Sequence, residues 1–193
     1  MKLARIVAIW AAVVAACVVP AIVAAMSPLH EWRSPVYIVA GFSGVIGLSL
    51  MFLQPILAAG LLPGVSSLNE RRIHRFIGIA LASCVVVHII GLWITSPPDV
   101  VDALLFVSAT PFSIWGVIAM WSIAITVFLV FFRRRLKLRV RRWRLSHRCL
   151  AAVTVLCTVL HAIRIEGTMG MVSKAALCVL IVLATGFVLI KRQ

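Results

Sequence analysis

Two stretches of this chain decide its fold: RRIHRFIGIALASCVVVHIIGLW (residues 71–93) and WRLSHRCLAAVTVLCTVLHAIRI (residues 143–165). Each stretch is apolar over most of its length, and each carries two histidines that are fourteen residues apart. An ionisable side chain inside a membrane is costly unless it faces the interior of the protein and has a partner there. The repeated pair of histidines therefore predicts a bound ligand, and haem is the ligand that fits best.

The composition predicts an all-α membrane protein. Of the 193 residues, 63% are hydrophobic and only 12% are charged, which excludes an ordinary soluble chain and predicts long apolar helices. We expect one bundle of six transmembrane helices that forms a single domain over residues 1–193. The expected spans are Ala4–Met26, Val36–Leu62, Ile73–Ile94, Phe112–Phe132, Leu145–Ile165 and Val172–Ile190.

Helical geometry places the four histidines at two levels. Fourteen residues at about 100° each fall about 40° short of four turns, so the two histidines of a pair share one helix face and lie roughly 21 Å apart. His74 and His147 are then expected near the inner surface, and His88 and His161 nearer the outer surface. Two histidines at each level can occupy both axial positions of one iron. We therefore predict two b-type haems, held between the third and fifth spans.

Other interpretations of the histidines explain less. A zinc ion needs all its ligands within about 2.1 Å, which two levels so far apart exclude. An interfacial position without haem is open for His74 and His147, which both adjoin an arginine, but it does not explain the deeper pair His88 and His161. His30, in the outer stretch SPLHEWRSP, is expected to be an exposed loop residue rather than a ligand.

The charge distribution orients the expected bundle. The net charge is +14, yet all but three of the 19 Lys and Arg residues fall in segments on one side of the membrane. The positive-inside rule then predicts cytoplasmic termini in a bacterial inner (plasma) membrane. The run RRRLKLRVRRWR (residues 133–144) is interpreted as a topology anchor on anionic lipid headgroups, with a docking site for an acidic electron donor as the second interpretation. Nucleic acid is not an expected partner.

Basic residues near the helix ends are candidates to pair with haem propionates. These candidates are Arg72, Arg75, Arg144, Arg148 and Arg164.

The two histidine stretches resemble the haem-binding helices of the ferric reductase-like transmembrane domain superfamily. That superfamily includes ferric-chelate reductases, the membrane part of NADPH oxidases, and MsrQ, the haem subunit of a bacterial methionine sulfoxide reductase system. The resemblance covers the six-helix layout. It implies that His74 and His147 are the axial ligands of the inner haem, and that His88 and His161 are those of the outer haem.

The expected function is electron transfer. The larger members of the superfamily continue into a flavin and nicotinamide domain, but this sequence has no G-x-G-x-x-G fingerprint after a strand. We therefore expect electrons from a separate cytoplasmic flavin reductase carrying FMN or FAD, or from a quinol. The leading hypothesis is an oxidoreductase component, without catalytic side chains of its own, that passes electrons through two haems to an outer acceptor such as ferric iron.

Two alternatives stay open. The first is an MsrQ-like haem subunit that donates electrons to one dedicated periplasmic reductase, although the complete set of four histidines favours the ferric reductase group. The second is a non-redox haem carrier or a structural membrane protein, which predicts exchangeable haem or none.

Overall fold

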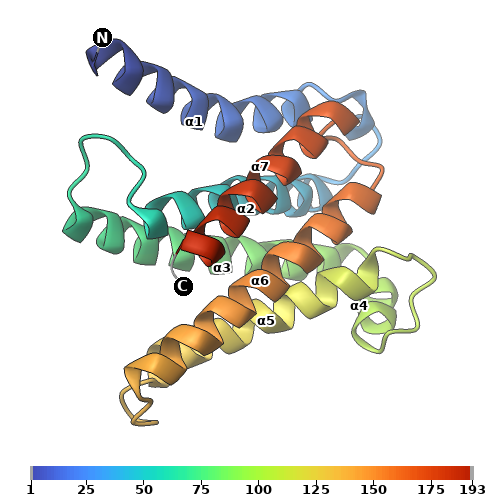
Figure 1. The fold of residues 1–193 in the computed structure, drawn as a ribbon. Coiled ribbons are helices and arrows are strands. Elements are labelled where there is room, and N and C mark those ends of the chain that lie inside the picture. The colour runs from blue at the N-terminus through green and yellow to red at the C-terminus, as the bar shows by residue number, and fades with distance from the viewer. Residues whose placement is uncertain (1, 192–193) are drawn as a thin grey trace. The chain divides into compact units, whose positions relative to one another are not determined.

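The computed structural model describes residues 2–191, and its regular structure in that range is helical (Figure 1). Arg192, one of the 19 Lys and Arg residues assigned above to one side of the membrane or the other, lies outside the described residues. The helices in chain order are α1 (Lys2–Ala25), the 3₁₀ turn η1 (Pro28–His30), α2 (Pro35–Ala59), α3 (Ser67–Thr95), α4 (Pro97–Leu104), α5 (Ser113–Phe132), α6 (Val140–Arg164) and α7 (Met171–Lys191).

Six of these helices, all except η1 and α4, are long and apolar enough to cross a membrane within the described residues. The prediction of an all-α membrane protein with six transmembrane helices is thus confirmed. A span of the hydrocarbon core needs about 20 residues, and each of the six helices meets that length.

Two of the expected spans begin too late. The helix α3 starts at Ser67 instead of Ile73, and α6 starts at Val140 instead of Leu145. Hydropathy marks where a helix enters lipid, whereas arginine is a good helix former and continues the helix into water. The side chain of Ser66 then sets the start of α3, because its hydroxyl accepts a hydrogen bond from the Asn69 N–H.

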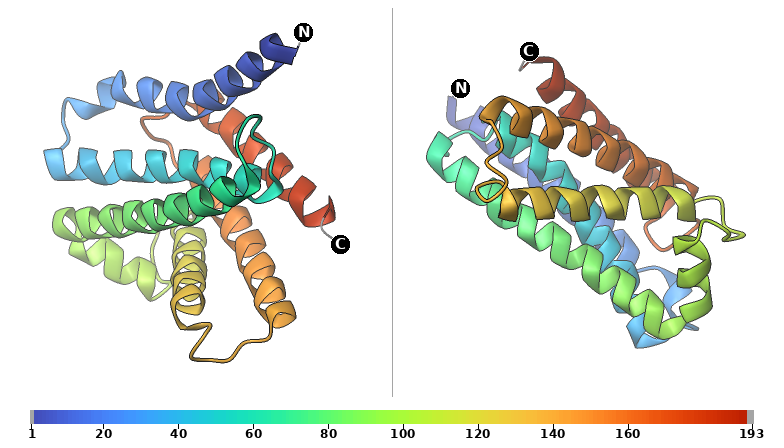
Figure 2. Two further views of the ribbon diagram at one scale, coloured as in Figure 1. Left: turned by 90° about the vertical axis from the view of Figure 1, so that its left-hand side faces the viewer. Right: turned by 90° about the horizontal axis from the view of Figure 1, so that it is seen from below.

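The chain forms two compact units, and each is described by itself. Unit 1 contains the residues up to Pro97 together with those from Glu166 onward, and unit 2 contains Pro98–Ile165. In unit 1, α2 and α3 form an antiparallel hairpin, and α1 and α7 pack on α2 (Figure 2). The helix α2 carries more buried residues than any other helix of this unit, so it is the centre of the packing.

The turn between α2 and α3 is fixed by a buried carboxylate. Gly60 ends α2 in the left-handed region at φ +70°, a conformation that favours glycine. Glu70, in the first turn of α3, is only 4% exposed, and its carboxylate accepts a hydrogen bond of 3.3 Å from the Leu62 N–H. This contact ties the start of α3 to the end of α2 and sets the register of the hairpin.

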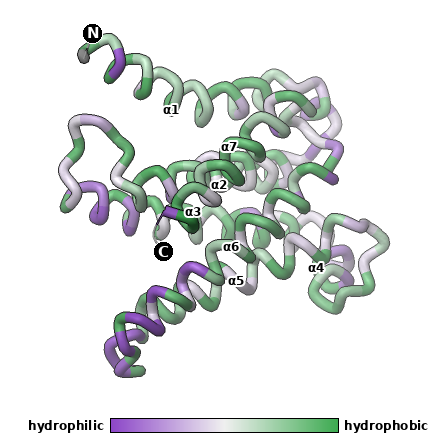
Figure 3. The backbone as a smooth tube through the Cα atoms, in the orientation of Figure 1, coloured by the Kyte–Doolittle hydropathy of each residue, from purple (hydrophilic) through white to green (hydrophobic). Residues whose placement is uncertain are grey.

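Unit 2 is built on a second antiparallel hairpin, formed by α5 and α6. Figure 3 shows hydrophilic residues gathered at the turn between these two helices, next to apolar helix bodies. The basic side chains of residues 133–144 are all exposed there. Within this unit the basic residues other than Arg164 therefore gather at one end of the hairpin, as expected for a membrane boundary.

Candidate functional site

The ring of His88 is fixed by the neighbouring helix of its own hairpin. Its Nδ1 lies 2.7 Å from the carbonyl oxygen of Ala40 on α2. A carbonyl oxygen only accepts hydrogen bonds, so Nδ1 must carry the proton, and the lone pair of the neutral ring lies on Nε2. A histidine that binds a metal commonly gives its other N–H to a backbone carbonyl in this way. Nε2 is thus the nitrogen of His88 that is left to bind a metal.

A glycine of α2 makes room for this ring. A Cβ atom at Gly44 would lie 3.2 Å from Nδ1 and 3.3 Å from Cε1 of His88, closer than ordinary van der Waals contact. Further along the helices, a Cβ atom at Gly91 would lie only 2.7 Å from the Cβ of Ala40. The backbones of α2 and α3 therefore approach closely on both sides of the hydrogen bond that holds His88.

His161 is held in the same manner in unit 2. Its Nδ1 donates to the carbonyl oxygen of Phe112, at the start of α5, over 2.9 Å. The Phe112 ring also meets the imidazole edge-on, with ring centroids 5.7 Å apart. A Cβ atom at Gly116 would lie 2.7 Å from Nδ1 and 2.8 Å from Cε1 of His161. The α5–α6 hairpin thus reproduces the carbonyl and the glycine that the α2–α3 hairpin provides for His88.

His74 is joined to α2 by two hydrogen bonds. Its Nδ1 donates to the carbonyl oxygen of Gln54 over 3.2 Å, and the side-chain amide of Gln54 donates to the carbonyl oxygen of His74 over 3.3 Å. A Cβ atom at Gly78, one turn further along α3, would lie 3.5 Å from that amide nitrogen. Three of the four predicted ligand histidines therefore have Nδ1 on a backbone carbonyl of their own unit.

His147 lies in an aromatic environment at the basic end of α6. The ring of Trp143, one turn earlier on the helix, stacks on the imidazole at a centroid distance of 5.4 Å. The guanidinium of Arg133 lies over the Trp143 ring at 5.8 Å. Trp143, which lies nearer the α5–α6 turn, therefore restrains the plane of the His147 ring.

The predicted propionate partners are placed on the same two helices as the histidines. Arg72 and Arg75 are exposed on α3, in unit 1. Arg144, Arg148 and Arg164 lie on α6, in unit 2, and of these only Arg148 is half-buried. The guanidinium of Arg164 lies 5.5 Å from the centre of the Trp115 ring on α5, so its position is partly fixed.

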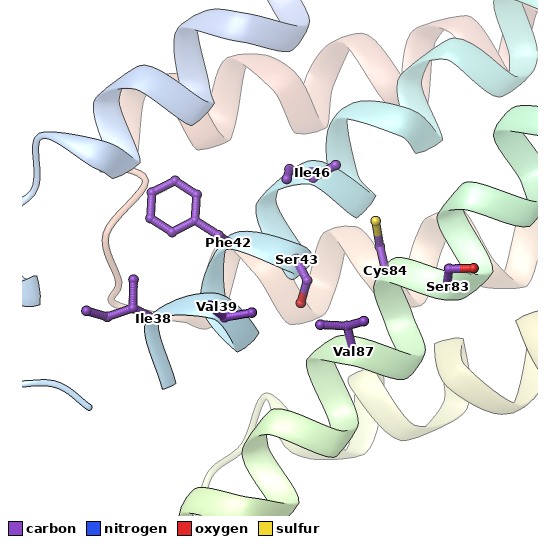
Figure 4. Close-up of a pocket in the computed structure, with 8 residues that line it drawn as sticks. All are labelled: Ile38, Val39, Phe42, Ser43, Ile46, Ser83, Cys84 and Val87. Atoms are coloured by element: carbon purple, nitrogen blue, oxygen red, sulfur yellow. The ribbon is translucent and has the colours of Figure 1, made fainter. Parts of the chain in front are cut away.

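Polydentate metal sites are absent from the part of the chain that the structure describes. No group of three or more His, Cys, Asp or Glu side chains there could hold a bare metal ion. An apolar groove of about 370 Å³ lies between α2 and α3 and is lined by residues such as Phe42, Ser43 and Cys84 (Figure 4). No histidine lines this groove, so it is not part of the candidate site.

The prediction that His30 is exposed is wrong. The residue ends the turn η1 and is half-buried instead of exposed. Its Nε2 donates to the carbonyl oxygen of Ala24 over 2.6 Å, and its ring stacks on Phe42 of α2 at a centroid distance of 5.5 Å. His30 therefore fixes the connection between α1 and α2.

Sequence reasoning missed the residues that hold the histidines. Ala40 and Phe112 act through backbone carbonyls, which carry no sequence signature. A signal was present for Gly44, which belongs to a row of glycines at three-residue spacing with Gly41 and Gly47. Glycines at such spacing favour close helix approach, which the structure shows at Gly44 but not at Gly41, where a Cβ atom would meet nothing within 4 Å.

Comparison with known families gives one match. The family model described as "Ferric reductase like transmembrane component" matches residues 40–158, which is more than half of the chain. This range begins at Ala40 and contains three of the four predicted ligand histidines, while His161 lies just beyond its end. No curated protein and no solved structure matches the chain.

Proposed function

Since the chain belongs to the ferric reductase-like transmembrane component family, we propose that it is a b-type cytochrome that carries electrons across a membrane. Membership in this family indicates an oxidoreductase-type membrane component. The finer proposal is that two haems are each held by one histidine of α3 and one histidine of α6. His74 and His147 would hold the inner haem, and His88 and His161 the outer haem.

The observation that supports this proposal best is the fixed orientation of the histidines. His74, His88 and His161 each donate from Nδ1 to a backbone carbonyl oxygen, at 3.2, 2.7 and 2.9 Å. Such bonds select the tautomer that binds iron through Nε2 and raise the basicity of that nitrogen. Histidines that only needed a hydrogen-bond partner in lipid could use either ring nitrogen. These three all use Nδ1 and leave Nε2 for a ligand.

Ligation by two histidines suits electron transfer. A haem held by two of these histidines would supply one-electron chemistry and would leave no position at the metal for oxygen or substrate. The chain itself would contribute by holding three of the four imidazoles against backbone carbonyls, which limits the movement of these rings.

The positions of the basic residues support the proposed orientation of the protein in the membrane. The basic run at residues 133–144 ends within one turn of helix from His147, and Arg72 and Arg75 flank His74. By the positive-inside rule these residues are cytoplasmic, and both termini with them. Arg164, stacked on Trp115 and three residues from His161, is the strongest candidate for pairing with an outer propionate.

The direction of transfer follows from this orientation. We propose that a cytoplasmic flavin reductase, or a quinol, supplies electrons at the level of His74 and His147. The acceptor, such as a ferric chelate, would take them at the level of His88 and His161. In this direction the electron donor lies in the cytoplasm, where the cell keeps its reduced nicotinamide cofactors. The electron acceptor lies on the outer side of the membrane.

The proposal is tested with the purified full-length protein in proteoliposomes. A flavin reductase with NADH on the side of the basic run should reduce haem, and a ferric chelate on the other side should reoxidise it. Reoxidation that requires a co-purified soluble protein would instead support an MsrQ-like subunit. Haem that exchanges freely and is not reduced by the flavin reductase would refute electron transfer and support a haem carrier.

A further inference from the structure

The two hairpins of this chain repeat one local arrangement that sequence identity alone does not reveal. His88 and the carbonyl of Ala40 are 48 residues apart in sequence, and His161 and the carbonyl of Phe112 are 49 residues apart. In both hairpins a glycine follows the carbonyl residue by one helical turn and faces the Nδ1–Cε1 edge of the imidazole. The common features are a carbonyl acceptor, a glycine one turn later and a histidine on the next long helix.

The surroundings of the two glycines also correspond. Gly44 is followed by Val45 and Ile46, and Gly116 is followed by Val117 and Ile118. Val45 and Val117 are both buried, at 7% exposed each. The two glycines therefore share a buried valine at the next position and a contact with the Nδ1–Cε1 edge of an imidazole.

We propose that Gly44 and Gly116 are equivalent positioning residues that set the ring orientation of the outer-level histidines. This inference rests on the proposed function, because it assigns the ring orientation a role in haem ligation. The carbonyl one turn earlier fixes Nδ1, and the glycine leaves the adjacent ring edge free to lie against the helix backbone. A side chain at either glycine would turn the imidazole about its hydrogen bond or break that bond.

The distances predict effects of different size at the two positions. A Cβ atom at Gly116 would come within 2.7 Å of His161 Nδ1, a contact that real structures do not tolerate, so the ring must move. A Cβ atom at Gly44 would lie 3.2 Å from His88 Nδ1, which a shift of a few tenths of an ångström relieves. The change Gly116→Ala should therefore disturb the outer haem strongly, and Gly44→Ala only mildly.

The chain offers two matched controls for these variants. A Cβ atom at Gly41, on α2, or at Gly186, on α7, would meet nothing within 4 Å. The changes Gly41→Ala and Gly186→Ala therefore introduce the same methyl group into a transmembrane helix without touching a histidine. In each variant the inner haem serves as an internal measure of correct folding.

The experiment measures haem per protein and the low-spin electron paramagnetic resonance spectrum of each full-length variant. The g-values of a bis-histidine haem depend on the angle between the two imidazole planes. A variant that only folded less well would keep this angle, and therefore its g-values, in the haem that remains. Loss of a partner that orients a ligand typically weakens metal affinity by about 10–100-fold. We expect Gly116→Ala to lose outer haem, and Gly44→Ala to keep it with shifted g-values.

The outcomes separate this inference from the proposed function. Wild-type protein without haem would refute the proposed function itself. Wild-type protein with two haems, combined with Gly44→Ala and Gly116→Ala variants whose outer-haem content and g-values equal those of Gly41→Ala, would overturn the inference alone. Loss of both haems in Gly116→Ala together with an unshifted spectrum in Gly44→Ala would overturn it as well.

Discussion

The contact between Gly91 and Ala40 allows one perturbation to be worked out in detail. In the change Gly91→Ala, the new Cβ would lie 2.7 Å from the Cβ of Ala40 and 3.3 Å from the carbonyl oxygen of Val36. Carbon atoms in contact prefer a separation of about 3.5–4.0 Å. The two helices must therefore move apart by about 1 Å at this point.

That movement has a calculable effect on His88, one turn away. Its Nδ1 now lies 2.7 Å from the carbonyl oxygen of Ala40, and a separation of about 1 Å would bring this distance beyond the range of a hydrogen bond. Overpacking typically costs about 1–3 kcal/mol. The lost orientation should lower the affinity for the outer haem by about 10–100-fold.

The assay is the content of each haem in the purified variant, read from redox difference spectra. We expect Gly91→Ala to lose outer haem and to retain the inner haem, because His74 and Gln54 are far along the hairpin. The control Gly41→Ala, on the facing helix, should keep both haems. Adding Ala40→Gly to Gly91→Ala removes the nearest clashing atom and should restore outer haem. Normal outer haem in Gly91→Ala, or no rescue by Ala40→Gly, would refute the reasoning.

Three further predictions concern other residues. His88→Ala should remove the outer haem and leave the inner haem reducible by dithionite; spectra that show both haems would contradict the ligand assignment. His30→Ala should leave haem content unchanged but lower the melting temperature in detergent, because it removes a hydrogen bond to Ala24 worth about 0.5–1.5 kcal/mol. Loss of haem in this variant would contradict a purely structural role for His30. Replacing Arg133, Arg134 and Arg135 by Gln should disturb topology, measured by labelling of introduced cysteines from each side, before it affects haem content.

Much of the fold could be predicted from the sequence because the membrane imposes strong rules on it. Every backbone polar group in lipid must be satisfied within a helix, so long apolar runs have one structural solution. The ends of α3 and α6 could not be predicted in this way. Hydropathy reports the lipid boundary, and the arginines before His74 and before His147 continue the helix beyond it.

The candidate site could be predicted only in part, for a different reason. Histidine carries its chemistry in its side chain, so His74, His88, His147 and His161 are visible in the sequence. The groups that orient them are mostly backbone carbonyls, which every residue possesses. Which carbonyl meets which imidazole depends on helix register, and that register is set by contacts such as the one between Glu70 and Leu62.

The glycines illustrate the same limit. The row Gly41, Gly44 and Gly47 indicates that a helix approaches α2, but spacing cannot say which glycine faces a ring. Gly116 is the only glycine of α5, so no spacing pattern marks it in the sequence. Its contact with His161 is nevertheless closer than the contact of Gly44 with His88.

The most direct measurement is the ratio of haem to protein in detergent-purified full-length material, expressed with ample haem and combined with its low-spin electron paramagnetic resonance spectrum. We predict two haems per chain, both low-spin with two histidine ligands. A colourless protein, or a single haem that survives the loss of any one of the four histidines, would contradict the proposed cytochrome.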